Sequence, residues 1–391
     1  MSTRASREGF VVGVEISGFV SPGFEAVREC FISNFDRDDH YREIGAGFCV
    51  YVSGECVIDL HGGFADRART RPWQEDTTAN IWSATKGLTA IAVAVLGDRG
   101  LIDYGERVGT YWPEFACQGK ENTTVSQVLS HQAGLPGFVE PITLEEFCDW
   151  PTVVSRLESQ APMWEPGTKN SYHAMTFGFL AGEIIRRASG KGIGAFLQEA
   201  VAEPLGADVY IGLPESEEPR VAEMVPSPLE LELDMSEMPP EALASVTNPT
   251  MEPGLPNNRL WRAAEIPAGN GQATARGLSK VYGAIANKGE LDGCRLLSES
   301  AIAAMNTVQT DRVDISIGVA PYWRNGHSGN INHMYGLGEN AFGHSGWGGA
   351  VGCADPDREI GIGYVVNQMG NEALGDERSV ALIHTLYDCL G

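Results

Sequence analysis

The sequence predicts an α/β fold in which one antiparallel sheet, built from both ends of the chain and flanked by helices, carries an inserted, mainly helical domain. Near the start, the apolar runs 46–52 and 56–61 are joined by Ser-Gly-Glu, a hairpin signal. Near the end, the runs 350–354 and 360–367 flank the turn sequence Asp-Pro-Asp-Arg-Glu. The segments between these strand pairs have helical periodicity. The simplest assembly therefore joins both ends in one sheet, with a cleft beside the helical insertion.

Apolar residues at helical spacing organise the rest of the chain. We expect helices over residues 23–35, 83–99, 124–131, 144–157 with an interruption at Pro151, 176–189, 277–287, 298–305 and 382–390. These elements predict a discontinuous α/β domain of residues 1–105 and 275–391. They also predict a mainly helical domain of residues 106–274 with long loops. Within it, residues 213–258 are rich in Pro, Glu and Met without periodicity, which is typical of a surface excursion that walls a cleft.

The chain is strongly acidic. Its 391 residues include 52 acidic and 28 basic side chains, for a net charge of -24. A surface this negative repels nucleic acid and anionic membranes, so we expect neither as a partner. The apolar run 10–14 is too short for a signal peptide, and no stretch approaches the ~20 apolar residues of a membrane span, which predicts a cytoplasmic protein. The oligomeric state stays open.

The eight cysteines are scattered along the chain, and none forms a C-x-x-C pair with metal-binding spacing. This usage is typical of reduced, buried thiols in a cytosolic enzyme. We expect no disulfide framework, no metal and no organic cofactor.

The sharpest chemical signal is Ser83-Ala84-Thr85-Lys86, an S-x-x-K at the start of a nearly uncharged, apolar helix. Residues three apart on a helix lie on the same face, so the Lys86 amine can reach the Ser83 hydroxyl. Burial lowers the pKa of a lysine, and its neutral form can then act as a base. A surface Ser–Lys pair is the plain alternative, but a lysine on such an apolar helix needs a reason.

Four blocks of sequence carry a resemblance to a known superfamily. They are IWSATKGLTA at 81–90, TTVSQVLSHQAGLPGF at 123–138, WEPGTKNSYHAMTFGFLAGEII at 164–185, and GHSGWGG at 343–349 followed by a strand, turn and strand. Together they resemble the serine β-lactamases, penicillin-binding proteins and related esterases. The blocks are most similar to those of the class C β-lactamase-like (family VIII) carboxylesterases. The resemblance implies the β-lactamase/transpeptidase-like α/β fold and a carboxylesterase that uses Ser83 as its nucleophile.

The same resemblance implies a catalytic role for Tyr172. It follows a Pro-Gly turn and precedes an apolar helix, which is where the family has its general-base tyrosine. A tyrosine that merely packs at a helix start is the alternative. Penicillin-binding enzymes usually have Asn two residues later to hold a substrate amide, and here that residue is Ala174. This departure argues against β-lactam and peptide recognition.

The third motif of the family has two possible registers here. They are His344-Ser345-Gly346 and Trp347-Gly348-Gly349, and the esterase branch resembles the second. A backbone N–H of Ala350 or Trp347 would then complete an oxyanion hole with that of Ser83. β-Lactamases have a carboxylate-binding Lys in this motif. Its absence favours simple esters as substrates.

Two further histidine segments have plainer interpretations. The tetrapeptide Gly-His-Ser-Gly occurs a second time at 326–329, in what we predict to be a polar loop with no strand after it. His131 matches a scaffold position of the family, so we expect it to be structural. The sequence also lacks a G-x-S-x-G nucleophile elbow, which argues against an α/β-hydrolase fold.

These residues predict a serine hydrolase that cleaves short-chain carboxylic esters through an acyl-enzyme on Ser83. Lys86 and Tyr172 would share the proton transfers, and the partner would be a small-molecule ester. On the same scaffold, a β-lactamase, an amide hydrolase or peptidase, and an acyltransferase stay open as alternatives. A scaffold protein without catalysis is also possible, although a decayed copy should have lost one of the three residues.

Overall fold

The computed structural model describes residues 9–11, 14–229 and 235–391 of the chain. Two residues of the apolar run 10–14 and five of the excursion 213–258 lie outside this described part. Among the helices that the structure describes, none is both long and apolar enough to cross a membrane.

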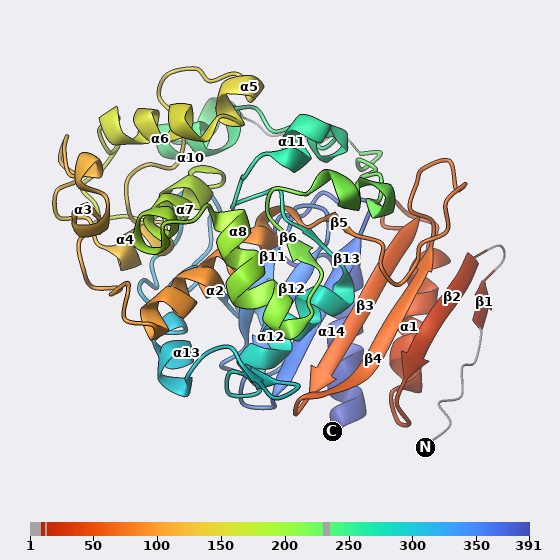
Figure 1. Ribbon diagram of the computed structural model, residues 1–391. Helices are drawn as coiled ribbons and strands as arrows, with labels where there is room; N and C mark the ends of the chain where they lie inside the picture. The colour runs from red at the N-terminus through yellow and green to blue at the C-terminus, as the bar shows by residue number, and fades with distance from the viewer. Residues whose placement is uncertain (1–8, 12–13, 230–234) are drawn as a thin grey trace.

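One eight-stranded sheet runs through the molecule, and each of its strands pairs antiparallel with its neighbours (Figure 1). In spatial order its strands are β1 (Gly9–Val11), β2 (Val14–Val20), β4 (Glu55–Gly63), β3 (Gly45–Val52), β13 (Ile360–Val366), β12 (Val351–Asp355), β11 (Phe342–Ser345) and β10 (Ser328–Gly329). Because β13 pairs with β3, the two ends of the chain meet in the middle of this sheet. The predicted fold class is confirmed.

Helices make up most of the remaining structure. They are α1 (Glu25–Phe35), α2 (Thr85–Asp98), α3 (Val108–Tyr111), α4 (Val125–Leu129), α5 (Leu144–Phe147), α6 (Trp150–Ser159), α7 (Thr176–Ser189), α8 (Ile193–Leu197), α9 (Glu203–Leu205), α10 (Pro240–Thr247), α11 (Arg259–Ala263), α12 (Ala275–Ala286), α13 (Glu299–Met305) and α14 (Glu377–Leu390). Two small sheets complete the described elements: β5 (Ala79–Asn80), β7 (Gln272–Ala273) and β6 (Val209–Tyr210) in one, β8 (Glu290–Leu291) and β9 (Cys294–Arg295) in the other.

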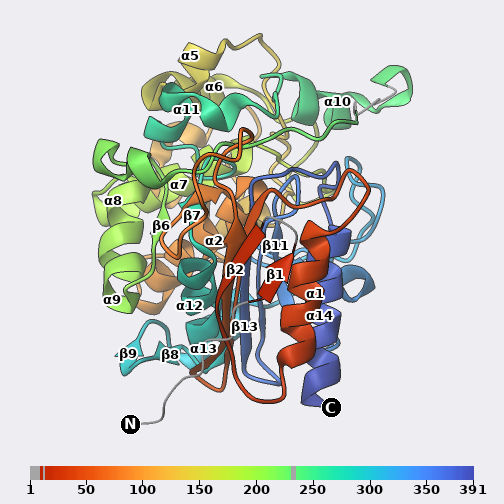
Figure 2. The ribbon, with the colours of Figure 1, turned by 90° about the vertical axis from the view of Figure 1, so that its right-hand side faces the viewer.

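Helices cover both faces of the sheet, and each face has its own apolar core (Figure 2). On one face, α1 and α14 lie side by side with their apolar residues against the strands. On the other, α12 packs so closely on β13 that a Cβ on Gly361 would lie 2.2 Å from the backbone nitrogen of Gly283. Helix α2 lies on this second side and is buried from Thr85 to Leu96, which explains its lack of charge.

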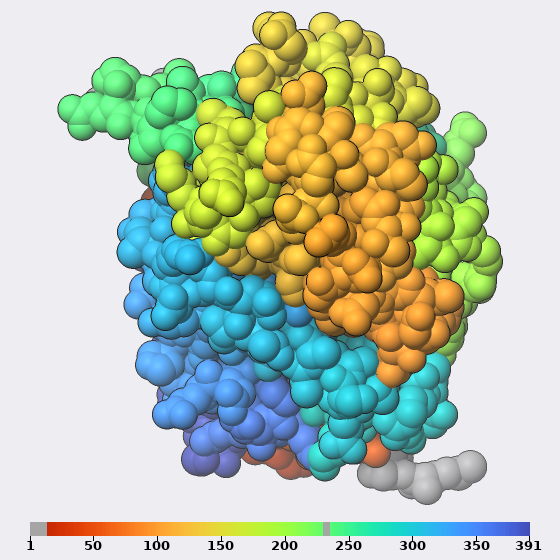
Figure 3. Space-filling view, turned by 90° about the vertical axis from the view of Figure 1, so that its left-hand side faces the viewer, coloured from red at the N-terminus to blue at the C-terminus, as the bar shows by residue number. Residues whose placement is uncertain are grey.

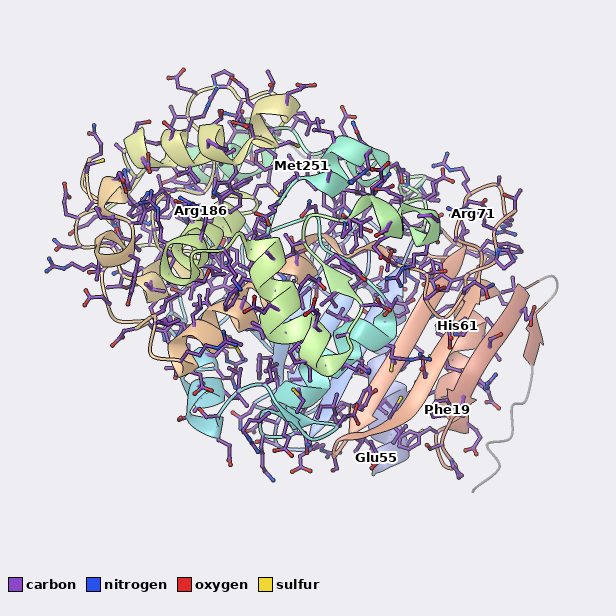
Figure 4. All side chains as sticks on the ribbon, viewed as in Figure 1. Phe19, Glu55, His61, Arg71, Arg186 and Met251 are labelled. Carbon is purple, nitrogen blue, oxygen red and sulfur yellow. The ribbon has the colours of Figure 1, made fainter. Side chains whose placement is uncertain are left out.

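The β3–β4 hairpin shows how local sequence sets the geometry. Ser53 and Gly54 both have positive φ, 46° and 80°, between the paired residues Val52 and Glu55, as a type I′ turn requires. Figure 4 places Glu55 at the lower end of these strands and Arg71, in the loop after β4, at their upper end, where the helical part of the chain begins.

Two local expectations were wrong, and one strand was missed. Residues 326–329 are not a loop without a strand, because β10 pairs with β11 through Ser328 opposite Gly343. A polar two-residue strand has no alternation to reveal it. Strand β2 was missed for a similar reason, since polar residues and Gly18 interrupt its pattern. Finally, Pro151 does not interrupt a helix but lies in the first turn of α6. The N–H groups of a first turn have no acceptor within the helix, so a proline there loses no helical hydrogen bond.

The division into residues 1–105 with 275–391 and 106–274 stays a prediction. The excursion 213–258 includes α10, which Figure 3 shows projecting from the body of the molecule.

Candidate active site

Ser83 lies in a tight turn that leads into the buried helix α2. A single 3₁₀ turn, Trp82–Ala84, precedes α2, and Trp82 has a positive φ of 42°. A left-handed conformation at a tryptophan is costly and persists only where the surroundings enforce it. Thr85 secures this turn, because its hydroxyl donates to Trp82 O at 2.5 Å and accepts from Gly271 N at 2.9 Å. Ser83 itself is half-buried, so its hydroxyl can be reached from outside.

Lys86 is fully buried beside Ser83. Its Nζ lies 3.1 Å from Ser83 Oγ and donates to the backbone oxygen of Ala268 at 2.9 Å. Burial holds the pKa of Lys86 well below its ordinary value. No carboxylate within the described residues forms an ion pair with it. The amine is therefore set up to be neutral, which a proton acceptor must be.

Tyr172 completes the cluster. Its hydroxyl forms a hydrogen bond with Ser83, and Lys86 Nζ lies 4.7 Å from the centre of its ring. Burial raises the pKa of Tyr172, so the phenol keeps its proton at neutral pH. The structure thus brings together Ser83, Lys86 and Tyr172, three groups that can pass one proton among themselves.

The third motif lies at the end of β11 beside the nucleophile turn. A Cβ on Gly346 would lie only 2.1 Å from the backbone oxygen of Ile81, so the strand touches the residue just before Trp82. The indole of Trp347 contacts that of Trp82, with ring centres 5.1 Å apart. Gly349 lies in the turn that follows, where a Cβ would meet Arg378 and Asp376. Gly346 and Trp347 therefore lie against the nucleophile turn, whereas Gly349 lies beside α14.

His344 lies on β11 with its ring 6.2 Å from that of Tyr172. Its Nδ1 is 2.9 Å from Ser345 O, and since a carbonyl only accepts, Nδ1 carries the proton and Nε2 is the free acceptor. Burial, with a smaller contribution from Lys86, holds the pKa of His344 well below its ordinary value. The ring is thus uncharged.

Among the described residues, one group has the ligand atoms and the closeness that a metal ion needs: Cys49, Cys56 and Asp59, within 4.8 Å of one another. It lies on the β3–β4 hairpin, and Asp59 is already ion-paired with Arg276. This group shares no residue with the Ser83 cluster, whose chemistry needs no metal ligand.

Comparisons with known proteins agree with this geometry. The β-lactamase family model matches residues 31–385, most of the chain. The chain belongs to the β-lactamase family. Among its relatives, the esterase/β-lactamase LipL of Mycobacterium tuberculosis is 35% identical over 377 residues, which cover 93% of this chain and 86% of LipL.

Two solved structures are similar over almost their whole length. A family VIII carboxylesterase has a TM-score of 0.91 and 46% identity, covering 96% of this chain and 100% of its own. A penicillin-binding protein homologue from Caulobacter crescentus has a TM-score of 0.89 and 40% identity, covering 96% and 99%. The resemblance drawn from the four sequence blocks is confirmed, including its carboxylesterase branch.

Several residues that shape this β-lactamase-family site were missed by the sequence analysis. Ser245 on α10 donates to the backbone oxygen of Tyr172 at 2.6 Å and accepts from Ala174 N at 3.3 Å. The fully buried Arg378 of α14 donates to Gly348 O at 2.9 Å and is ion-paired with Asp376 and Glu43. These residues come from distant parts of the chain, and no local spacing marks them.

His131 supports the site from behind. It is buried, its Nδ1 accepts from His173 N at 3.0 Å, and its ring lies 4.9 Å from that of Tyr172. Burial holds its pKa well below the ordinary value. These contacts agree with the scaffold position expected for it.

Proposed function

We propose that this chain is a serine hydrolase of the carboxylesterase type, with Ser83 as nucleophile. The observation that carries the proposal is the buried, unpaired Lys86 amine 3.1 Å from Ser83 Oγ, with the Tyr172 hydroxyl bonded to the same serine. Esterase is part of the name of LipL, and the structure with a TM-score of 0.91 is a carboxylesterase, which supports ester chemistry here.

The proposed reaction begins with the neutral Lys86 amine taking the proton of Ser83 as Oγ attacks the ester carbonyl. Tyr172, still a phenol, passes a proton to the leaving alcohol and is reprotonated from Lys86. A water molecule then attacks the acyl-enzyme, and its proton returns through the same two groups as Ser83 leaves. Protons balance in both halves, because Lys86 ends each half neutral.

We assign the oxyanion hole to the backbone N–H groups of Ser83 and Trp347. In the described part of the chain, neither N–H has a backbone acceptor, whereas the neighbouring Gly346 N–H is bonded to Ala350 O. Trp347 directly follows Gly346, the residue that touches the nucleophile turn. The Ala350 N–H likewise has no backbone acceptor among the described residues, and it is the alternative donor; Ala350 lies across the turn from Gly346.

A glycine-to-alanine change tests this assignment. In Gly346→Ala the new Cβ would meet the backbone of Ile81, so β11 and the nucleophile turn must move apart. We expect kcat to fall roughly a hundredfold, the cost of misplacing a reacting group by about 1 Å, with KM changed much less. Gly254→Ala is the control, since its Cβ would meet nothing within 4 Å. If both variants have the same kcat, the end of β11 does not contribute to the oxyanion hole and the assignment is wrong.

We propose short-chain esters without a carboxylate as substrates. His344 is neutral where β-lactamases have Lys, and Ala174 offers no side-chain amide group. The ring of Trp82 contacts those of Trp261 and Trp347, with 5.6 Å and 5.1 Å between ring centres, and of the three only Trp347 is partly exposed beside the nucleophile turn. Neutral, compact acyl groups match an indole in that place.

Kinetics on p-nitrophenyl butyrate, p-nitrophenyl palmitate and nitrocefin test the substrate class. We expect kcat/KM for the butyrate to exceed that for nitrocefin roughly a hundredfold, since a missing charged partner costs a few kcal/mol of transition-state binding. The palmitate should also be poor. A nitrocefin value equal to the butyrate value would favour a β-lactamase, and ester product formed with an added alcohol would favour an acyltransferase.

A further inference from the structure

The segment between α13 and β10 holds the backbone of Tyr172 through one aspartate. Asp314 is fully buried, and its Oδ1 accepts from Tyr172 N at 3.0 Å. The same oxygen accepts from Ser316 N at 3.0 Å and Ile317 N at 3.2 Å, so the carboxylate also shapes its own loop. A buried carboxylate that receives several N–H donors is stabilised without a cation.

The other oxygen of Asp314 controls the ring of Tyr172. Oδ2 accepts from the indole Nε1 of Trp323 at 2.9 Å and from Asn170 Nδ2 at 3.2 Å. The Trp323 ring is fully buried and stacks on the Tyr172 ring, with 5.7 Å between centres and 6° between planes. One carboxylate thus holds both the backbone of Tyr172 and the plane against which its ring rests.

The charge of Asp314 also matters for Tyr172. Burial is the main cause of the raised pKa of Tyr172, whereas Ser83 lowers that pKa. Tyr335 and Asp314 add smaller increases, because a negative charge near a phenol disfavours the tyrosinate. The proposed reaction needs Tyr172 as a phenol that can give a proton to the leaving alcohol. The position and the negative charge of Asp314 therefore both favour Tyr172 as a proton donor to the leaving alcohol.

We infer that Asp314 is a positioning residue for Tyr172, and that its carboxylate and the indole of Trp323 together hold the phenol hydroxyl against Ser83. This inference rests on the proposed function. It adds a residue 142 positions away from Tyr172 in the sequence to the machinery of proton transfer.

Asp314→Asn tests the inference, because it keeps the size of the side chain but removes the charge and turns one acceptor into a donor. We expect kcat for p-nitrophenyl butyrate, and the rate at which a fluorophosphonate labels Ser83, to fall ten- to a hundredfold. KM should change less than about twofold. A fall in kcat with KM kept separates a misplaced phenol from weakened substrate binding.

Asp66→Asn is the matched control. Asp66 is also a buried carboxylate that organises a loop, accepting from Thr70 N at 2.7 Å and Arg71 N at 3.4 Å, but it does not touch Tyr172. Its variant should keep the wild-type kcat and labelling rate. Thermal unfolding of each variant shows that the compared proteins are folded.

Trp323→Phe keeps the inference testable if Asp314→Asn does not fold. Phenylalanine preserves a ring for stacking but lacks the indole N–H, so kcat should fall several-fold with KM unchanged. If the folded variants keep the wild-type kcat and labelling rate, the inference is wrong while the proposed function stands. If the wild-type protein neither hydrolyses esters nor is labelled at Ser83, the proposed function itself fails.

Discussion

Ser83→Ala should lose ester hydrolysis by at least roughly 10⁴-fold in kcat, because Ser83 Oγ is the atom that forms the acyl bond. The protein should stay folded, since Ser83 is half-buried and its removal deletes one oxygen from a polar site. Hydrolysis of p-nitrophenyl butyrate measures the loss. Mass spectrometry after fluorophosphonate treatment should place the adduct on Ser83 in the wild-type protein and find none in the variant.

The serines of the two Gly-His-Ser-Gly segments are the natural controls. Ser328 and Ser345 are buried on adjacent strands, and Tyr335 OH lies 2.9 Å from one hydroxyl and 3.5 Å from the other. Among the described residues, neither serine has a hydrogen bond with a lysine. Ser328→Ala should therefore keep the wild-type rate of fluorophosphonate labelling. An adduct on Ser328 or Ser345 in the wild-type protein would show that this serine, and not Ser83, is the nucleophile.

Local sequence rules predicted the parts of this molecule that depend on neighbours along the chain. The hairpin at Ser53-Gly54 and the buried helix after Ser83 follow from turn chemistry and from the absence of charge. The pairing of Ser83 with Lys86 needs only helical geometry, because three residues bring both side chains to one face. Such features are decided within a few residues, so a single sequence reveals them.

The rest of the site depends on contacts that no local pattern encodes. Asp314, Ser245 and Arg378 reach the site from a loop, from α10 and from α14, and each looks like an ordinary polar residue in the sequence. Strand β10 is visible only in the structure, since two residues form it and β11 supplies its pairing. Likewise, no local pattern shows that Gly346 of the third motif touches Ile81 of the nucleophile turn.

The pH dependence of kcat/KM should report the protonation state of Lys86. Its pKa is lowered by burial, and catalysis needs the neutral amine, so kcat/KM should rise with pH as Lys86 loses its proton. Lys86→Arg should be inactive over the whole range, because a guanidinium does not deprotonate in proteins. An arginine variant with wild-type activity would mean that charge, and not proton transfer, is what Lys86 supplies.

Lys86→Ala and Tyr172→Phe should each lower kcat by about a hundredfold or more, as general acid–base groups do. The phenylalanine keeps the ring contacts with Trp323 and His131, so its effect isolates the hydroxyl. Both groups handle the same proton, one as acceptor from Ser83 and the other as donor to the leaving alcohol. Once either is gone the relay is broken, and the double variant should lose little more than the worse single variant. Measuring kcat for the wild type, both single variants and the double variant checks this. Fully additive losses would show two independent functions and would require Tyr172 to act on the substrate without Lys86.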